Sequence, residues 1–266
     1  MKSIYAFRIL VVSLALSILL ACSTLSPASV PTATLVPTSI PPTATAALLL
    51  SQQVTLVSQS NEETNQTPPF TIKVQVPQLA GSDDPRVTAF NQRLNDIVTK
   101  EVEMWRKSFL ENTFPTVTNG SSLEVTPTLI AQAGDLWSFK FDFHFYSDGA
   151  AHPGTYSITL NYDLAQGREL ALSELFLPTS NYLETIANYC KAELGKQPFF
   201  EGPFAEGANP TPENYRNWNI TSNGLMVTFD EYQVAPYAAG PQVVQIPIDQ
   251  LQQVVDPNGP LKIILP

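Results

Sequence analysis

The sequence predicts an α+β fold in which a mainly antiparallel β-sheet packs with two long helices and one short C-terminal helix. Two patterns carry this prediction. Apolar and polar residues alternate over 137–145 and again over 156–164, as in strands with one buried face. Between Val87 and Phe109, apolar residues instead recur every three or four positions, which is the period of an amphipathic helix. The resulting order of strand, helix, strands, helix, strands and helix is typical of an α+β domain.

The N-terminal elements lead up to a central hairpin. Short strands are predicted at 54–57 and 70–76, and the latter alternates apolar and polar residues. In the first long helix, Asp83 or Asp84 can cap the start and Pro85 suits the first turn. The strands 137–145 and 156–164 form a hairpin around a Gly- and Pro-containing loop, 147–154. A turn then leads into a short strand that runs through Leu170 and Leu172.

The second long helix is expected to begin at Ser180 or Asn181, with Glu184 completing a capping box, and to end at Gly195. Residues 196–214 hold four Pro and little periodicity, which predicts a long loop. Three further elements follow. They are a hairpin formed by 219–220 and 225–229 around Ser222-Asn223-Gly224, a strand at 243–248, and a short last helix over 248–255.

Composition excludes several functional classes. The 266 residues hold 14 Lys+Arg against 24 Asp+Glu, a formal charge of −10, which would repel a nucleic-acid backbone. Two cysteines cannot form a disulfide framework or a four-thiolate zinc site. We therefore expect no nucleic-acid partner, no metal and no cofactor.

The N-terminus predicts export and lipid anchoring. Residues 1–21 have the short positive region and apolar stretch of a signal peptide, and Leu19-Leu20-Ala21-Cys22 resembles a bacterial lipobox. Lipid on Cys22 would place the chain outside the cytoplasm on a membrane, at the cell surface or in the periplasm. An ordinary cleaved signal or an uncleaved anchor is the alternative. The stretch 22–49 is rich in Pro and Thr and has no charge, which predicts a disordered, extended linker.

Several sequence segments of the folded part resemble known envelope domains. Residues 76–81 resemble the deacetylase-associated, PdaC-type domain (DUF4163), which assigns residues 50–148 to an N-terminal half. Three other stretches resemble the RsiV-like domain of unknown function (DUF3298), which assigns 149–266 to a C-terminal half; they are 149–153, 162–176 and 229–247. The resemblance implies a module found in lysozyme-sensing anti-sigma factors, where it binds lysozyme, and beside catalytic domains in peptidoglycan deacetylases. In neither setting does the module itself catalyse a reaction.

The candidate site residues divide into titratable and aromatic groups. His144 and His152 are the only histidines, so a Ser-His-Asp or Cys-His site would need one of them. His144 shares a strand face with Asp142, and His152 lies in the hairpin loop near Asp148, where it either contacts a ligand or fixes the loop. Cys190 lies on an apolar helix stripe, which favours a buried, inert thiol.

A second loop supplies aromatic candidates. Tyr232, Pro236 and Tyr237 form an aromatic and proline cluster between two strands, which suits either a rigid exposed platform or a turn whose rings complete the core. The ligand-binding candidates are therefore His152, Pro153, Tyr232, Pro236 and Tyr237.

The sequence thus predicts a lipid-anchored, non-enzymatic binding module of the cell envelope. Its acidic charge favours a basic protein, and the resemblance suggests a lysozyme-like hydrolase, or else peptidoglycan. Two other classes stay open. One is an envelope carbohydrate hydrolase or deacetylase that uses His144 or His152, and the other is a purely structural envelope lipoprotein.

Overall fold

The computed structural model describes residues 49–112 and 120–265, all within one compact unit, 46–266. The predicted signal peptide, Cys22 and residues 22–48 of the predicted linker lie outside the described residues. Within the described ranges, no helix has the length and hydrophobicity that a membrane span requires. Both helix and sheet are present, and the α+β prediction is confirmed.

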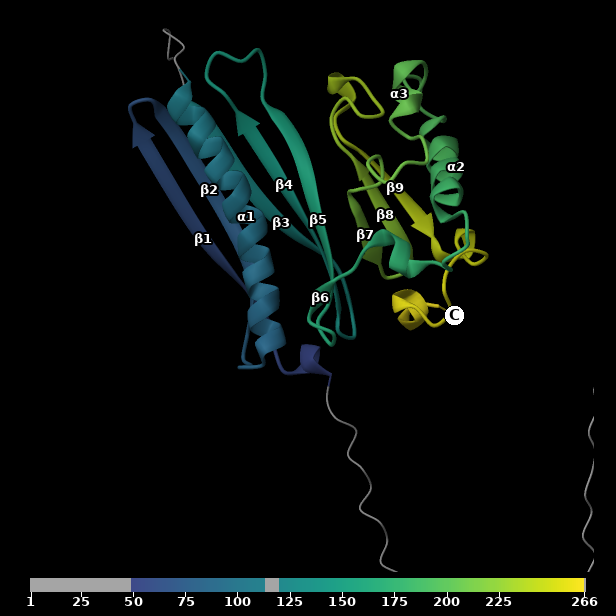
Figure 1. Ribbon diagram of the computed structural model, residues 1–266. Helices are drawn as coiled ribbons and strands as arrows, with labels where there is room; N and C mark the ends of the chain where they lie inside the picture. Colours follow the sequence, from purple (N-terminus) through teal and green to yellow (C-terminus); the bar gives the residue numbers. More distant parts are fainter. Residues whose placement is uncertain (1–48, 113–119, 266) are drawn as a thin grey trace, which may run out of the picture. The chain divides into compact units, whose positions relative to one another are not determined.

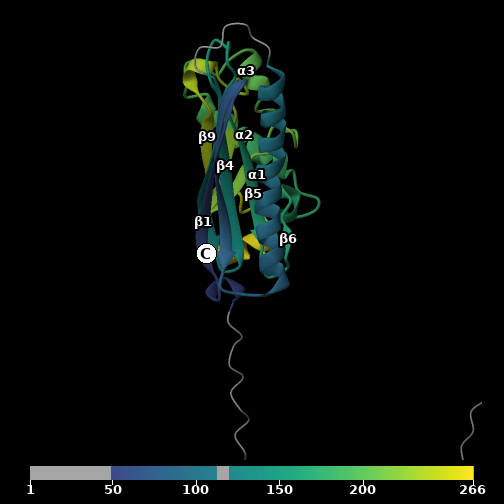
Figure 2. The ribbon, with the colours of Figure 1, turned by 90° about the vertical axis from the view of Figure 1, so that its left-hand side faces the viewer.

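A six-stranded sheet occupies the N-terminal part of this unit, and its strands are ordered as in the chain. Neighbouring strands pair antiparallel, except that β2 and β3 are parallel. Helix α1, Pro85–Glu111, makes the crossover between those two strands and lies along one face of the sheet (Figures 1 and 2). The strands are β1 (Thr55–Gln66), β2 (Pro69–Ala80), β3 (Ser121–Ala133), β4 (Leu136–Tyr146), β5 (Gly154–Asp163) and β6 (Arg168–Glu169).

The first long helix forms as the sequence predicts. Asp84 is the N-cap, its carboxylate accepts the backbone N–H of Arg86 at 2.9 Å, and a proline opens the first turn. Phe90 on the buried stripe is fully covered, with its ring centroid 4.9 Å from that of Tyr162 and 6.0 Å from that of Phe139. The alternating apolar residues of β4 and β5 therefore form the core together with α1.

The second sheet holds three strands in the order β7-β8-β9, at Trp218–Thr221, Gly224–Phe229 and Gln242–Pro247. Helix α2, Tyr182–Leu194, packs against it, and both contribute to a separate hydrophobic cluster. The two clusters of the unit divide between Leu164 and Leu170. The predicted boundary at 148/149 lies between β4 and β5, which pair with each other in the first sheet.

Several elements differ from the sequence-based expectation. The 13-residue strand β3 was not predicted, because polar residues and Pro127 obscure its alternation. The predicted long loop 196–214 contains the one-turn helix α3, Pro203–Glu206. The side chain of Asn181 makes no capping hydrogen bond, so the predicted capping box with Glu184 is wrong.

The last predicted helix, 248–255, is a 3-10 turn at Ile248–Gln250 followed by further turns. At the end of this segment, Val255 forms an antiparallel β-bridge with Phe176. Leu177 N–H donates to the carbonyl of Val254 at 2.9 Å, and Asp256 N–H donates to that of Leu175 at 3.0 Å. These bonds engage backbone groups that a continuing α-helix would need.

A buried polar network joins the two sheets on the face opposite α1. The side-chain amide of Asn161 on β5 donates to the carbonyl of Trp218 at 2.8 Å and accepts the N–H of Ile220 at 2.9 Å, so it pairs with β7 as a neighbouring strand would. Asn219 Nδ2 donates to Ser138 Oγ at 2.9 Å and to the carbonyl of Phe139 at 2.8 Å. We call Ser138, Asn161 and Asn219, each at most 3% exposed, the buried joint.

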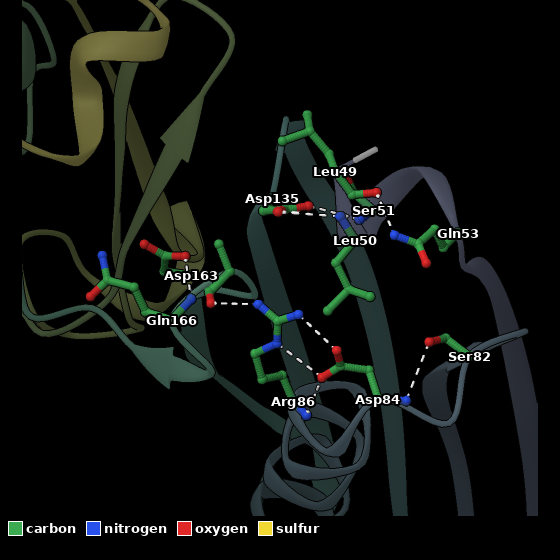
Figure 3. A network of polar contacts seen from close by, with 11 residues as sticks. Leu49, Leu50, Ser51, Gln53, Ser82, Asp84, Arg86, Asp135, Asp163 and Gln166 are labelled. Carbon is green, nitrogen blue, oxygen red and sulfur yellow. Dashed lines mark hydrogen bonds and ion pairs between the residues drawn. The ribbon is translucent and has the colours of Figure 1, made fainter. Parts of the chain in front are cut away.

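At the β3–β4 turn, hydrogen bonds to a carboxylate hold the start of the described chain (Figure 3). The Asp135 carboxylate accepts the backbone N–H groups of Leu50 and Ser51, at 3.3 and 2.7 Å. Arg86 binds the Asp84 carboxylate and donates from Nη1 to the carbonyl of Ala165 at 2.8 Å. The N-terminus of α1 is thereby tied to the β5–β6 turn.

Candidate binding surface

Aromatic side chains from two distant segments meet beside the tip of the β4–β5 hairpin. The His152 ring of that tip stacks on Tyr237 of the β8–β9 connection, with centroids 3.9 Å apart. The rings of Tyr237 and Tyr232 stack in turn at 5.8 Å. We call His152, Tyr232 and Tyr237 the aromatic cluster. Its members were candidates in the sequence, and the structure brings them together.

Hydrogen bonds fix the rings of the cluster. The carbonyl of Pro153 accepts the Tyr237 hydroxyl at 2.9 Å and lies 2.8 Å from Nδ1 of His152. A carbonyl can only accept, so Nδ1 carries the proton in this contact. Nε2 of His152 lies 3.4 Å from the hydroxyl of Tyr232 and is its acceptor when the ring is neutral. Pro153 therefore contributes its backbone rather than its side chain to these contacts.

Two carboxylates hold the β8–β9 connection against β5. Glu231 Oε2 accepts the backbone N–H of Thr155 at 3.1 Å, and Asp230 Oδ1 accepts that of Ser157 at 2.9 Å. Arg216 and Asn217 bind the other oxygen of Asp230, at 2.6 and 3.1 Å. The carboxylates thus take the place of a neighbouring strand along this part of the β5 edge. Sequence reasoning missed both anchors, because their role depends on that exposed edge.

Tyr232 combines exposure with an unusual backbone. Its φ is +65°, it is the one non-glycine residue of the described ranges with positive φ, and it is 56% exposed. Non-glycine residues in the left-handed region cost on the order of 1 kcal/mol and concentrate at functional sites. Pro236 is the N-cap of the 3-10 turn Tyr237–Ala239, so its contribution is to position Tyr237.

The other histidine lies outside this cluster. His144 is exposed, and its Nδ1 lies 2.9 Å from Oγ1 of Thr155. Its strand neighbour Asp142 is engaged elsewhere, with Lys140 Nζ at 2.9 Å and the Ser157 hydroxyl at 2.8 Å. Cys190 is fully buried, and this burial raises the pKa of its thiol to about 12, as expected for an inert thiol. Within the described residues, no group of three or more His, Cys, Asp or Glu is placed to hold a metal.

The two stretches that supply the aromatic cluster, 141–167 and 217–261, contain no Lys or Arg. Asp230 is paired with Arg216, whereas the Glu231 carboxylate contacts a backbone amide. These stretches therefore offer a ligand aromatic faces and no basic side chain.

Comparison with known sequences places a family domain in the C-terminal part. Residues 173–249 match the family described as "Protein of unknown function (DUF3298)". The chain is 30% identical over 104 residues to "Esterase Rv3036c" of Mycobacterium tuberculosis, covering 39% of this chain and 46% of that protein. It is 26% identical over 165 residues to "Peptidoglycan-N-acetylmuramic acid deacetylase PdaC" of Bacillus subtilis, covering 61% and 35%. The chain thus spans less than half the length of these two relatives.

Two solved structures share the fold. A DUF3298 family protein from Bacteroides fragilis superposes with a TM-score of 0.56 at 16% identity, covering 79% of this chain and 96% of that one. Another from Pseudomonas aeruginosa gives 0.54 at 17% identity, covering 77% and 95%. At these identities the likeness shows the fold alone. Residues 173–249 are therefore similar to the DUF3298 family, and the chain shares its fold with solved DUF3298 proteins.

Proposed function

We propose that the chain is a lipid-anchored, extracytoplasmic binding module of the cell envelope and that the aromatic cluster is its ligand surface. One observation carries the proposal: rings from segments about 80 residues apart are stacked and hydrogen-bonded, while Tyr232 stays 56% exposed. Fixed aromatic rings offer a large contact area at little cost in side-chain entropy.

A basic protein is the ligand class that the charges favour. All 24 acidic residues and 12 of the 14 basic ones lie after residue 61, so this part of the chain carries 12 − 24 = −12. Such a charge steers cationic proteins toward the surface. The RsiV-like resemblance, in which the module binds lysozyme, supports a lysozyme-like wall hydrolase as the partner.

Peptidoglycan is the second candidate ligand, and the exposed aromatic faces favour it. Stacked tyrosine rings with fixed orientation suit the flat faces of sugar rings as well as protein side chains. The net negative charge of the chain weighs against it, because peptide stems carry carboxylates that this charge would repel.

Non-catalytic binding is supported by the way the two histidines are engaged. His152 contacts a backbone carbonyl and a tyrosine, and neither histidine has a carboxylate contact that would orient it as a base. The alternative, a hydrolase or deacetylase, finds support in the 2.9 Å contact between His144 and the Thr155 hydroxyl and in the names of the two relatives. Turnover of ester or peptidoglycan substrates that disappears in His144→Ala would establish that alternative.

Anchoring through Cys22 can be tested separately from binding. We expect cells expressing the full chain to incorporate labelled palmitate into it and to retain it in the membrane fraction. Cys22→Ala should lose both properties. Equal labelling of the Cys22→Ala chain would contradict the lipidation proposal.

Retention of ligands by the immobilised full chain tests the proposed function. We expect a basic lysozyme to be retained at low salt and released as salt rises, because the attraction between exposed charges is screened. The double variant Tyr232→Ala/Tyr237→Ala should lose retention. Val243→Ala, which truncates an exposed apolar residue on β9, is the control and should retain as the wild type does. If neither basic lysozymes nor purified peptidoglycan are retained, the structural-lipoprotein alternative is preferred.

A further inference from the structure

A cavity of about 470 Å³ lies between the last turns of α1 and the β4–β5 tip. Met104, Glu111 and Asn112 line it from the helix and its C-cap, and Ser147 and Asp148 line it from the tip. The same tip carries His152 four residues later, so one bound partner can contact both the cavity and the aromatic cluster.

Asp148 is a buried carboxylate that has no partner in the part of the chain that the structure describes. The residue is 4% exposed, and neither carboxylate oxygen has a hydrogen-bond partner among the described residues. Its backbone is well held, because its N–H donates to Ser121 Oγ at 3.0 Å and its carbonyl accepts Asn112 Nδ2 at 3.0 Å. A buried carboxyl group without a polar partner is costly, and a cation beside it would offset that cost.

Three further features of the cavity favour a cationic ligand. The C-terminus of the 27-residue helix α1 borders the cavity, and its dipole attracts positive charge. The last turn of α1 contains no basic residue, and Glu111 adds a second carboxylate. Lys107 also lines the cavity, but its Nζ lies 3.9 Å from the Glu111 carboxylate and largely offsets that charge.

The rim of the cavity includes one large apolar side chain. Met104, which lines it from α1, is 49% exposed. Lysine and arginine side chains place their methylene stems along apolar surface while the charged head reaches a polar partner. A rim of this kind above a buried carboxylate suits such a side chain better than a bare metal ion, for which the cavity offers too few ligands.

We propose that this cavity receives a lysine or arginine side chain of a basic partner protein and that the Asp148 side chain, whose oxygens are covered in the free protein, turns toward it to pair with its ammonium or guanidinium group. The proposal rests on the proposed function, since it names the contact by which a basic protein is held beside the aromatic cluster. The cavity can nevertheless be tested without that partner.

The first experiment measures binding of a basic lysozyme to the full chain by calorimetry at low salt. Asp148→Asn should weaken binding more than about tenfold, as expected when one partner of a buried charge pair is removed. Glu184→Gln, which removes an exposed charge on α2, should leave the affinity unchanged. Asp148→Asn should also unfold at an equal or higher urea concentration, because it removes a buried charge and keeps both backbone contacts. Unchanged affinity, or a clear loss of stability in Asp148→Asn, would overturn the inference.

The second experiment titrates the full chain with Nα-acetyl-arginine methylamide and follows backbone amide shifts by NMR. Saturable shifts at Asp148 and Gly149 are expected with this ligand and not with the uncharged citrulline analogue, and Asp148→Asn should abolish them. Absence of such shifts in the wild type would overturn the inference whatever partner the protein has. If the shifts occur but no basic lysozyme binds, the cavity assignment stands and the proposed partner class fails.

Discussion

Two of the contacts between the first sheet and the second part of the unit are built very differently. At the buried joint, Ser138, Asn161 and Asn219 are almost fully covered and link backbone groups of the two sheets. At the aromatic cluster, the contact is made by stacked rings, one of them more than half exposed. Buried amides that link backbone groups are explained by holding the two sheets together, whereas exposed rings and a left-handed tyrosine are not needed for that role.

The largest effect should come from breaking the buried joint. Asn161→Ala leaves the carbonyl of Trp218 and the N–H of Ile220 without their partner in a buried site, so we expect a loss of about 2–4 kcal/mol in the free energy of unfolding. Urea denaturation measures this loss. Asn188→Ala on the exposed side of α2 is the matched control and should change stability by less than about 0.5 kcal/mol. A small effect of Asn161→Ala would mean that the joint is not structural.

A smaller effect is expected from the backbone of Tyr232. Tyr232→Gly and Tyr232→Ala remove the same ring, but only glycine adopts φ near +65° without strain. The glycine variant should therefore be more stable than the alanine variant by about 1 kcal/mol, measured by urea denaturation. Equal stabilities of the two variants would show that the left-handed backbone is not strained, which removes one sign of a functional site.

The smallest effect is expected from lowering the pH. Acid weakens ion pairs but leaves the neutral amides of the buried joint unchanged. Hydrogen bonds from Arg86 lower the pKa of Asp84 to about 2, and those from Arg106 lower the pKa of Glu63. A carboxyl whose pKa is lower in the folded protein stabilises it above the unfolded-state pKa of about 4, and this contribution is lost as the pH falls toward 2.

Urea unfolding between pH 5 and pH 2.5 should therefore show a gently falling free energy, and Asp84→Asn should make the fall shallower. The loss caused by Asn161→Ala should stay the same across this range, because an amide does not titrate. An identical fall in Asp84→Asn and the wild type would contradict the assignment of this ion pair.

Much of the fold follows from local pattern. The alternation in β4 and β5, the stripe of α1 and the Asn-Gly turn before β8 are each decided by residues close in sequence, and the structure confirms them. Strand β3 and the division into two sheets were missed because they depend on partners far along the chain. The segment after β9 was predicted as a helix but forms a 3-10 turn at Ile248–Gln250. This was missed for the same reason, because the β-bridge between Val255 and Phe176 depends on a residue far along the chain.

The candidate site divides in the same way. His152, Pro153, Tyr232 and Tyr237 could be named as candidates because aromatic and proline residues in loops are conspicuous in a sequence. Asp230, Glu231 and Asn161 were not, because a carboxylate or amide that pairs with a strand edge resembles any polar surface residue until that edge is known. Among the described residues, the carboxylate oxygens of Asp148 are buried without a hydrogen-bond partner. This depends on tertiary packing and cannot be predicted from the neighbouring sequence.

The most direct test of the account compares the affinity of a basic lysozyme for the full chain and for Tyr232→Ala/Tyr237→Ala, by calorimetry at low salt. Removal of two central aromatic residues is expected to weaken binding at least about tenfold. The unfolding midpoint should meanwhile stay close to that of the wild type, because the buried joint is untouched. If the double variant remains folded and binds with unchanged affinity, the aromatic cluster is not the ligand surface.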